Sequence, residues 1–583
     1  MKRILAWLLV LSLLLAGCAA KNETETDVPS EPSAADTKPG AAAEAGSEPA
    51  AAEPARIAEA PKADTVIVLS DDGITVNGVP VSEDSTQALY TARDIVYYPA
   101  GMDFTFGEGT EDDAHEAEEA DGHTVLHITQ PGTYEISGRL SAGQIAVDLG
   151  EDAEEDPEAV VTLLLNGVDI TCTVAPAVIF YNVYECGYLQ AVGAEVDTSS
   201  AGANVFLADG SVNNISGSYV AKIYKPESVV LNDEGTEVTD AKKLHKYDAA
   251  FYSKMSMNLD GNDGILNILA ENEGLDSELH LTVNGGDIRI ESGNDGINTN
   301  EDGVSVTTVN GGKLTITVNG STGEGDGIDS NGWLVINGGR VCAFACGFSG
   351  DAGIDSDMGI YLNGGSVIAS GNMLDHIAGG DLCYAVFNFA SQQSGGSTFL
   401  LKNAAGDAVI EANPQNDCSV LILASEVMTE GEYTLWRDGQ QLAGGSGMGA
   451  MMRPEGMERP EGTEPPEGME PPEGMEFPEG MEPPEGMERP EGMERPEGME
   501  FPEGMERPEG MEFPEGMERP EGMEPPEGME RPEGMEFPEG MEFPEGGFGG
   551  RGGFGRGELT GEQSSVFRIE AGGSYFSGVT PIE

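Results

Sequence analysis

The residues of this sequence that could do chemistry are acids and amides in a repeated phrase. A phrase of the type x-Gly-Ile-Asp-Ser occurs at 273–277, 295–299, 326–330 and 352–356. Its variable positions hold mostly carboxylates and one asparagine, whose oxygens are ligands that calcium prefers. Zinc takes clustered His or Cys, and the sequence has no such cluster. The phrase therefore predicts calcium sites and argues against zinc or redox chemistry.

A second phrase, Asn-Gly-Gly, alternates with the first. Its copies begin at Asn284, Asn310, Asn337 and Asn363. The spacing of 26 or 27 residues indicates a repeated structural unit, and the leucine pattern of leucine-rich repeats is missing. After each Asn-Gly-Gly the residues alternate between apolar and polar, as in 313–318, which is typical of strands. The sequence therefore predicts an all-β fold, a parallel β-helix with one strand-rich coil per repeat.

In such a fold, equivalent positions of successive coils lie about 4.8 Å apart, so like residues form ladders. One predicted ladder holds Glu273, Asp295 and Asp326, with Asp351 shifted by one residue, and the other holds Asp276, Asn298, Asp329 and Asp355. Carboxylates this close repel by roughly 3 to 4 kcal/mol at an effective dielectric near 20, so a column of them needs counter-ions. We expect a bend at the glycine of each phrase to present the oxygens on both sides of the corner. The alternative is that the acids are solvated turn residues.

Three aromatic residues form a candidate sugar-binding surface. Trp333 and Tyr361 are predicted at outward positions of adjacent coils, two residues out of register and therefore about 7 to 8 Å apart. Phe344 is expected beyond them on the next side of the coil. Flat rings in these positions could stack on sugar faces. The alternative left open is that a loop covers them.

The first residues predict export. Lys2 and Arg3 precede a short apolar run, and the sequence Leu-Ala-Gly-Cys then ends at Cys18. The run is too short to span a bilayer and is typical of a signal peptide. The Cys-containing end resembles a bacterial lipobox, which implies a lipid on Cys18 and a protein anchored at the cell surface, on the outer face of the bacterial membrane.

Composition divides the rest of the chain. Residues 19–64 are rich in Ala, Glu and Pro and predict a disordered tether. A hexapeptide of the form [Arg/Pro/Phe]-Pro-Glu-Gly-Met-Glu then recurs about fifteen times, and its Pro and Gly exclude helix and sheet ladders. We predict a β-helix domain over 65–444, a low-complexity insertion over 445–557 and a closing strand within 558–583. The net charge of −75 argues against a nucleic-acid partner.

In combination, several short motifs resemble those of a family of bacterial carbohydrate-binding lipoproteins. They are Gly-Thr-Tyr-Glu-Ile-Ser-Gly at 132–138, Leu-Asn-Gly-Val-Asp-Ile at 165–170 and Tyr-Ser-Lys at 252–254, together with the two phrases above. The resemblance implies a right-handed parallel β-helix like that of pectate lyases, with calcium along the coils and binding of pectic polygalacturonate or cellulose. The chain departs from the family by its hexapeptide insertion and by Asn298 and Ala352, where the ladders lose charge.

We therefore expect a monomeric, non-catalytic protein that binds acidic or plant cell-wall polysaccharide with the help of calcium. A lyase would need a base, and none of the basic residues in the coils stands in a recognisable motif. These residues are Lys254, Arg289, Lys313 and Arg340. Two alternatives stay open, a calcium-dependent polysaccharide lyase and a surface adhesin or structural protein that makes contact through the hexapeptide tract.

Overall fold

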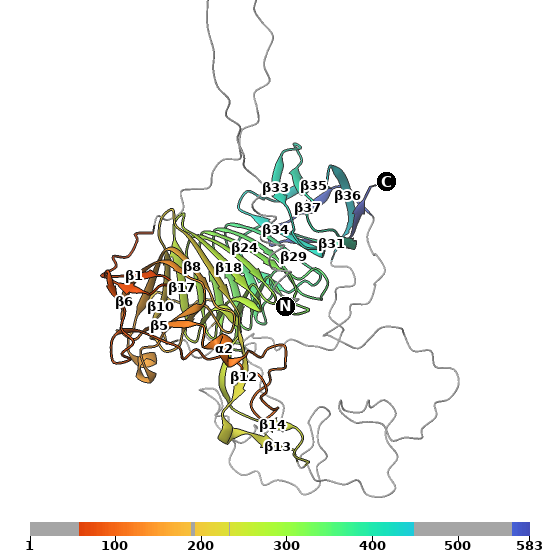
Figure 1. The fold of residues 1–583 in the computed structure, drawn as a ribbon. Coiled ribbons are helices and arrows are strands. Elements are labelled where there is room, and N and C mark those ends of the chain that lie inside the picture. Colours follow the sequence, from red (N-terminus) through yellow and green to blue (C-terminus); the bar gives the residue numbers. More distant parts are fainter. Residues whose placement is uncertain (1–57, 188–192, 233, 448–562, 583) are drawn as a thin grey trace, which may run out of the picture. The chain divides into compact units, whose positions relative to one another are not determined.

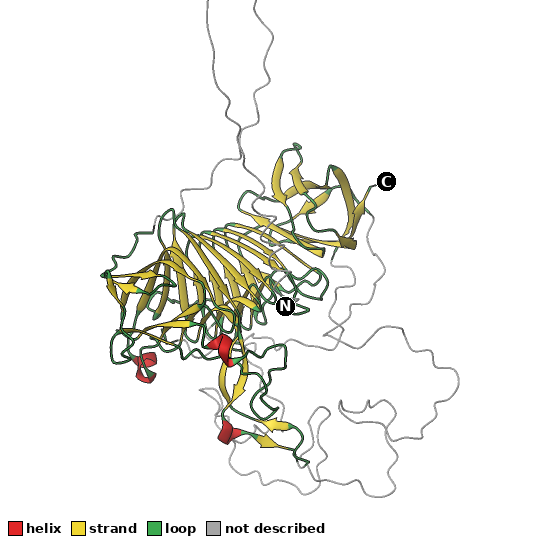
Figure 2. Ribbon diagram, viewed as in Figure 1, coloured by secondary structure: helices red, strands yellow, loops and turns green. Residues whose placement is uncertain are grey.

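The computed structural model describes residues 58–187, 193–232, 234–447 and 563–582. Figure 2 shows that this part of the chain is almost entirely strand and loop, which confirms the predicted all-β class. Its helical elements are the single turns α2 (Ala117–Ala120), η1 (Glu151–Glu155) and η2 (Pro226–Ser228). None of them is long and apolar enough to cross a membrane. The predicted lipidation site Cys18, most of the predicted tether and the hexapeptide tract lie outside the described residues.

Three stacks of parallel strands hold most of the strand residues of the described chain (Figure 1). The first stack consists of β6 (Gly132–Leu140), β8 (Val161–Thr171), β10 (Ala203–Leu207), β17 (Met257–Gly261), β20 (Leu281–Val283), β23 (Val306–Val309), β26 (Trp333–Ile336), β28 (Gly359–Leu362) and β30 (Ile377–Gly379). The second stack begins with the C-terminal end of β8. It continues with β11 (Val212–Gly217), β18 (Ile265–Ala270), β21 (Asp287–Ser292), β24 (Lys313–Val318), β27 (Arg340–Phe344) and β29 (Ser366–Gly371). The third stack consists of β5 (Thr124–Ile128), β7 (Gly143–Val147), β9 (Val178–Phe180), β16 (Ala249–Ser253), β19 (Glu273–Ser277), β22 (Ile297–Thr299) and β25 (Ile328–Ser330).

Smaller elements flank the stacks. At the N-terminal end, β1 (Thr65–Leu69) pairs in parallel with β6, while β2 (Thr75–Val76), β3 (Val79–Pro80) and β4 (Leu89–Ala92) pair antiparallel with their neighbours. Between β11 and β16 the chain forms two short antiparallel pairs. These are β12 (Val220–Tyr224) with β15 (Lys243–Tyr247), and β13 (Val230–Leu231) with β14 (Val238–Asp240).

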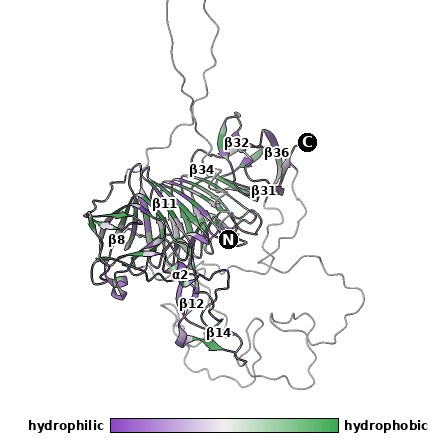
Figure 3. Cartoon of the chain, in the orientation of Figure 1, coloured by the Kyte–Doolittle hydropathy of each residue, from purple (hydrophilic) through white to green (hydrophobic). Residues whose placement is uncertain are grey.

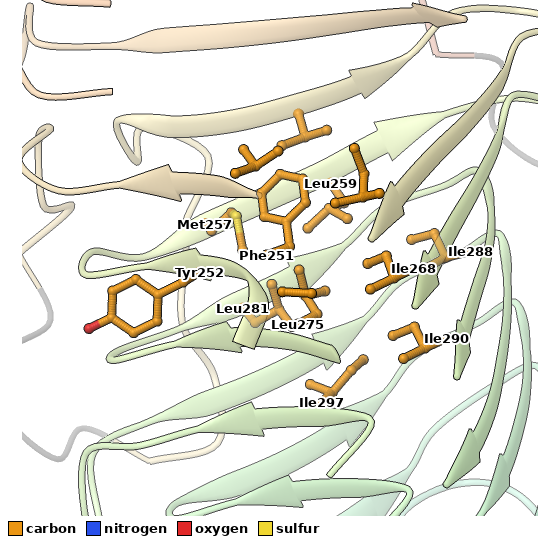
Figure 4. Close-up of a cluster of buried hydrophobic side chains, with 14 of the residues drawn as sticks. Phe251, Tyr252, Met257, Leu259, Ile268, Leu275, Leu281, Ile288, Ile290 and Ile297 are labelled. Atoms are coloured by element: carbon orange, nitrogen blue, oxygen red, sulfur yellow. The ribbon is translucent and has the colours of Figure 1, made fainter. Parts of the chain in front are cut away.

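The core lies between the three stacks and is built from the alternation visible in the sequence. Ile288, Leu314, Val341 and Val367 align across successive strands of the second stack, and each is at most 1% exposed. Figure 4 shows side chains from neighbouring coils meeting in this interior, and Figure 3 shows the alternation of polar and apolar residues along the strands. Burial of each such side chain contributes about 1.5 to 3 kcal/mol.

The Asn-Gly-Gly phrases form the corner between the first and second stacks. Each asparagine donates a side-chain hydrogen bond to the one before it, with N–O distances of 2.8 to 2.9 Å. We call Asn284, Asn310, Asn337 and Asn363 the asparagine ladder. The second glycine of each phrase has a positive φ, which is +76° at Gly312. A Cβ there would also lie 2.6 Å from the carbonyl oxygen of Gly286.

The three parallel stacks end at β30. Beyond it, β34 (Cys418–Ser425) pairs antiparallel with β29, and a second apolar core forms above it. The other strands of this part are β31 (Tyr384–Gln393), β32 (Phe399–Asn403), β33 (Ala408–Ala412), β35 (Gly431–Arg437), β36 (Gln440–Ser446), β37 (Phe567–Ile569) and β38 (Ser574–Pro581). The closing strand predicted within 558–583 corresponds to β37 and β38, which pair with β35, β36 and β31. Gly444 and Ser564, on either side of the hexapeptide tract, exchange two backbone hydrogen bonds of 2.9 Å.

Gly312→Ala should destabilise the protein by about 1 to 3 kcal/mol, because the new side chain is strained at positive φ and meets the neighbouring coil. Gly350→Ala is the matched control. A Cβ at Gly350 meets nothing within 4 Å, and its φ is not in the left-handed region. Chemical unfolding followed by circular dichroism would compare the two, and equal midpoints would contradict the corner geometry.

Candidate functional site

The repeated acidic phrase forms part of the third stack. Asp276, Asn298 and Asp329 align in register on β19, β22 and β25, as the second predicted ladder requires. Their backbones are linked by the hydrogen bonds of the parallel ladder, and Leu275, Ile297 and Ile328 beside them point into the core. The residue type and the spacing of the phrase therefore place oxygen-bearing side chains one above another.

The first predicted ladder has an additional role that sequence reasoning missed. Asp295 Oδ1 accepts a hydrogen bond of 2.7 Å from the backbone N–H of Asp326, and Asp326 Oδ1 accepts one from the N–H of Ala352. Asp351, predicted one residue out of step, accepts from the N–H of Gly325 at 2.7 Å. Each of these carboxylates thus binds the backbone of another coil and helps to fix the stacking.

At one end of the ladders, three carboxylates converge. Asp248, Glu273 and Asp276 each bring one carboxylate oxygen to within 4.8 Å of the others. The residues are 7%, 5% and 0% exposed. We call these three residues the acidic cluster. A bend at the glycine was expected to present the oxygens of Glu273 and Asp276 on both sides of the corner, whereas the structure buries both side chains.

Two oxygens of the acidic cluster and one of the neighbouring Asn298 lack a hydrogen-bond partner. Asn298 donates to Glu273 Oε1 at 3.1 Å, and Asn300 donates to Asp276 Oδ1 at 2.9 Å. Three side-chain oxygens are buried without a hydrogen-bond partner, namely Glu273 Oε2, Asp276 Oδ2 and Asn298 Oδ1. Lys246, at the end of β15, forms an ion pair with Asp248. Buried unpaired oxygens are costly, so this arrangement fits a small cation coordinated by oxygen.

The pKa values of the cluster reflect the same burial. Burial raises the pKa of Glu273 and of Asp276 well above the ordinary range, and the neighbouring carboxylates add to both shifts. Burial also raises the pKa of Asp248, although Lys246 acts in the opposite direction. Without a metal ion, burial therefore favours the protonated form of these carboxyl groups.

The remaining predicted ligands lie farther along the ladders. Burial and the nearby Asp329 raise the pKa of Asp295 to about 8, and burial raises that of Asp326 well above its usual range. Burial followed by the charge of Asp375 raises the pKa of Asp355 to about 8. The eight predicted residues thus do not form one centre. Within the described ranges, a three-carboxylate group this tight occurs at the acidic cluster alone.

Sequence reasoning missed Asp248, Lys246 and Asp375. A signal for Asp248 was present, because β16 pairs with β19 and aligns Phe251 with Leu275 and Ser253 with Ser277. Residues 249–253 are therefore a degenerate copy of the acidic phrase, and Asp248 lies one residue before the position that aligns with Glu273. It was hidden because the glycine of the phrase is replaced by alanine and its aspartate by tyrosine.

The predicted aromatic surface is corrected by the structure. The register is as expected, since Val335 pairs with Tyr361, but Trp333 is only 9% exposed. Ala194 and Val196, from a long connection of the chain, pack against Trp333. Phe344 is 4% exposed because the C-terminal sheet covers it. Of the three predicted residues only Tyr361 is partly exposed, so they do not form a flat sugar-stacking surface.

Comparisons with known proteins place this site within a recognised sequence region. Residues 121–376 match the family model described as carbohydrate-binding domain-containing protein. A curated protein of Acetivibrio thermocellus with the same description is 26% identical over 186 residues, which is 31% of this chain and 51% of that protein. The match therefore spans about half of the relative's length. The matched family region contains the acidic cluster and the asparagine ladder.

One solved structure is also similar. It is described as a polysaccharide lyase-like protein from C. thermocellum in a gadolinium derivative. It is 18% identical, covers 54% of this chain and 92% of that one, and gives a TM-score of 0.31. A TM-score this low does not establish a common fold.

In EDTA, the protein should become less stable as the pH rises from about 5 to about 8. A buried acid whose pKa is raised keeps its proton in the folded state and loses it in the unfolded state, so higher pH favours unfolding across this window. The pKa of about 8 at Asp295 sets the upper limit. Thermal melting in EDTA would test this, and Asp295→Asn should flatten the profile. A melting temperature that rises across this window would contradict the protonated state.

Proposed function

We propose that this chain is a non-catalytic carbohydrate-binding protein whose coils hold calcium, and that it binds acidic or plant cell-wall polysaccharide through that ion. The observation that carries the proposal is the buried acidic cluster with its unpartnered oxygens. The carbohydrate part rests on the family match over residues 121–376. Each part has its own test below.

The donor set of the cluster favours calcium. Asp248, Glu273, Asp276 and the Asn298 carbonyl oxygen would be the ligands, and all of them supply oxygen. Calcium takes six to eight oxygen ligands in flexible geometry, whereas zinc prefers nitrogen and sulfur. An ion here would neutralise the carboxylates and remove the cost of burying them. Its role would be to stabilise the coils, because all three carboxylates of the acidic cluster are buried.

The other end of the ladders is the better place for an ion that also contacts sugar. Asp329 and Asp355 are partly exposed, Asp357 is exposed, and the charges of Asp329, Asp357 and Asp375 act on Asp355. An ion held by these carboxylates would keep coordination positions facing solvent. Uronate carboxylates could take those positions, so calcium would bridge two acidic partners that otherwise repel each other.

One feature supports binding without catalysis, and another supports the β-helix architecture. Lys254 is paired with Glu154 at 2.5 Å and Arg289 with Asp287 at 2.8 Å, so two of the four basic residues considered as lyase bases are engaged in ion pairs. We also infer that the three parallel stacks are the faces of a β-helix, because from β16 to β27 the chain enters the third, first and second stacks in turn, with one strand in each. A lipid on Cys18 would anchor this domain at the outer face of the membrane.

Calcium should raise the melting temperature at pH 8 in the native protein, and Asp276→Asn should reduce that rise. The substitution removes a charge from the cluster and is expected to weaken ion binding roughly tenfold. Glu291→Gln, at an exposed position of β21, is the matched control and should retain the full rise. Differential scanning calorimetry with added calcium would measure both, and an Asp276→Asn protein with the native calcium response would refute the site.

Affinity electrophoresis in polygalacturonate gels tests the sugar contact. The native chain should migrate more slowly with calcium than with EGTA, because chelation removes the bridging ion. The double variant Asp355→Asn and Asp375→Asn should lose most of the retardation, while Glu291→Gln should keep it. Retardation that survives both EGTA and the double substitution would show that calcium does not mediate binding.

A further inference from the structure

A groove of about 880 Å³ lies over the outer face of the first stack. Two rows of side chains form its floor, with one residue from each coil in each row. The first row is Thr162, Asn204, Asn258, Thr282, Thr308 and Val335, which the strand register places side by side. The second row is the asparagine ladder. No residue of the acidic cluster lines the groove, so it is a separate site.

One wall of the groove is held firmly in place. The Thr198 hydroxyl donates to Asn258 Oδ1 at 2.7 Å and contacts the Thr282 hydroxyl at 2.7 Å. Asn258 donates back to the Thr198 carbonyl oxygen at 2.7 Å. Nearby, Val196 packs in the small apolar group that contains Val335. The wall therefore has a defined position before any ligand binds, which lowers the entropic cost of binding.

The asparagine ladder has hydrogen-bonding capacity beyond what its own contacts use. An amide side chain carries two N–H donors and two acceptor lone pairs. Within the ladder, Asn310 and Asn337 each donate one N–H to the previous asparagine and accept one from the next. Both residues are exposed, so each can offer a further donor and acceptor to a ligand. These groups recur about every 4.8 Å along the groove.

The charge of the groove selects against an acidic ligand. Glu59, Glu195, Asp197 and Asp260 line it, and no Lys or Arg of the described residues does so. Like charges brought together cost free energy. Hydroxyl groups instead match the exposed amides of Asn310 and Asn337 in the groove.

We propose that this groove binds an uncharged polysaccharide chain that lies across successive coils, with its hydroxyl groups bonded to the asparagine ladder. The repeat of the floor suits a polymer of hydroxyl-bearing units better than a single sugar. The inference rests on the carbohydrate-binding part of the proposed function and does not depend on calcium. Acidic polysaccharide would bind at the ladder end around Asp355, away from this groove.

Affinity electrophoresis of the full chain in hydroxyethylcellulose gels with EDTA tests the proposal. The native protein should be retarded. Asn337→Asp replaces a donor with a negative charge and should weaken retention roughly tenfold, the effect of losing one hydrogen bond near a charge. The control is Asn267→Asp, which disrupts an equivalent bond from Asn267 to Asn214 in the second stack and should retain full binding. Equal retention of the two variants, whether high or low, would overturn the proposal.

Charge selection gives a second test that does not depend on the fold of the ladder. Carboxymethylcellulose has the same backbone as hydroxyethylcellulose but carries negative charge, and it should retard the native chain less. Replacing the exposed pair Glu195→Gln and Asp197→Asn should narrow this difference and leave hydroxyethylcellulose retention unchanged. The matched control is Glu430→Gln with Glu432→Gln, at exposed residues that do not line the groove. It should change neither the difference between the two polysaccharides nor the retention in hydroxyethylcellulose. If replacing Glu195 and Asp197 left the difference in retardation between the two polysaccharides unchanged, the result would contradict the site.

The two proposals fail in distinguishable ways. Loss of calcium-dependent retention in polygalacturonate with intact binding to hydroxyethylcellulose would refute the bridging ion and leave the groove standing. A native chain that hydroxyethylcellulose does not retard in EDTA, while polygalacturonate with calcium does, would refute the groove alone.

Discussion

Parallel backbone pairing places each residue of a coil directly beside its equivalent in the next coil, and the rest of this structure depends on that constraint. A side chain in this arrangement must be compatible with copies of itself about 4.8 Å away. Aliphatic residues satisfy the condition by packing, as Ile288 and Leu314 do. Asparagine satisfies it because an amide both donates and accepts. Carboxylates cannot bond to one another once ionised, so a column of acids needs help from other groups.

The acidic positions use three kinds of help. Asp295 and Asp326 accept backbone N–H groups of the following coil, Asn298 interrupts the charge of its ladder, and Lys246 neutralises Asp248. None of these contacts involves Glu273 Oε2 or Asp276 Oδ2, which are buried without a hydrogen-bond partner. The asparagine at 298, which the sequence suggested as a loss of charge, is therefore better understood as a donor that allows Glu273 to be buried beside it.

Much of the fold could be predicted because the repeat encodes it directly. The period defined the coils, and the alternation after each Asn-Gly-Gly identified the residues of the core. The burial of Trp333 and Phe344 could not be predicted, since the segments that cover them lie far away in the sequence and carry no repeat. The acidic cluster was only partly predictable for a related reason. Its third member, Asp248, belongs to a coil in which the phrase has diverged, and strand pairing places it one residue before Ala249, the position aligned with Glu273.

The two backbone hydrogen bonds between Gly444 and Ser564 have a consequence for how the number of hexapeptide repeats in the gene can change. Gly444 and Ser564, which flank the insertion, are joined by two backbone hydrogen bonds, so the described domain has the same boundary whatever number of hexads separates them. Repetitive coding sequence gains and loses whole units during replication, and such events keep the reading frame because each unit is a multiple of three nucleotides. Each doubling of a loop's length costs only about 0.6 kcal/mol of closure entropy, so a changed number of hexads should alter the stability of the domain little.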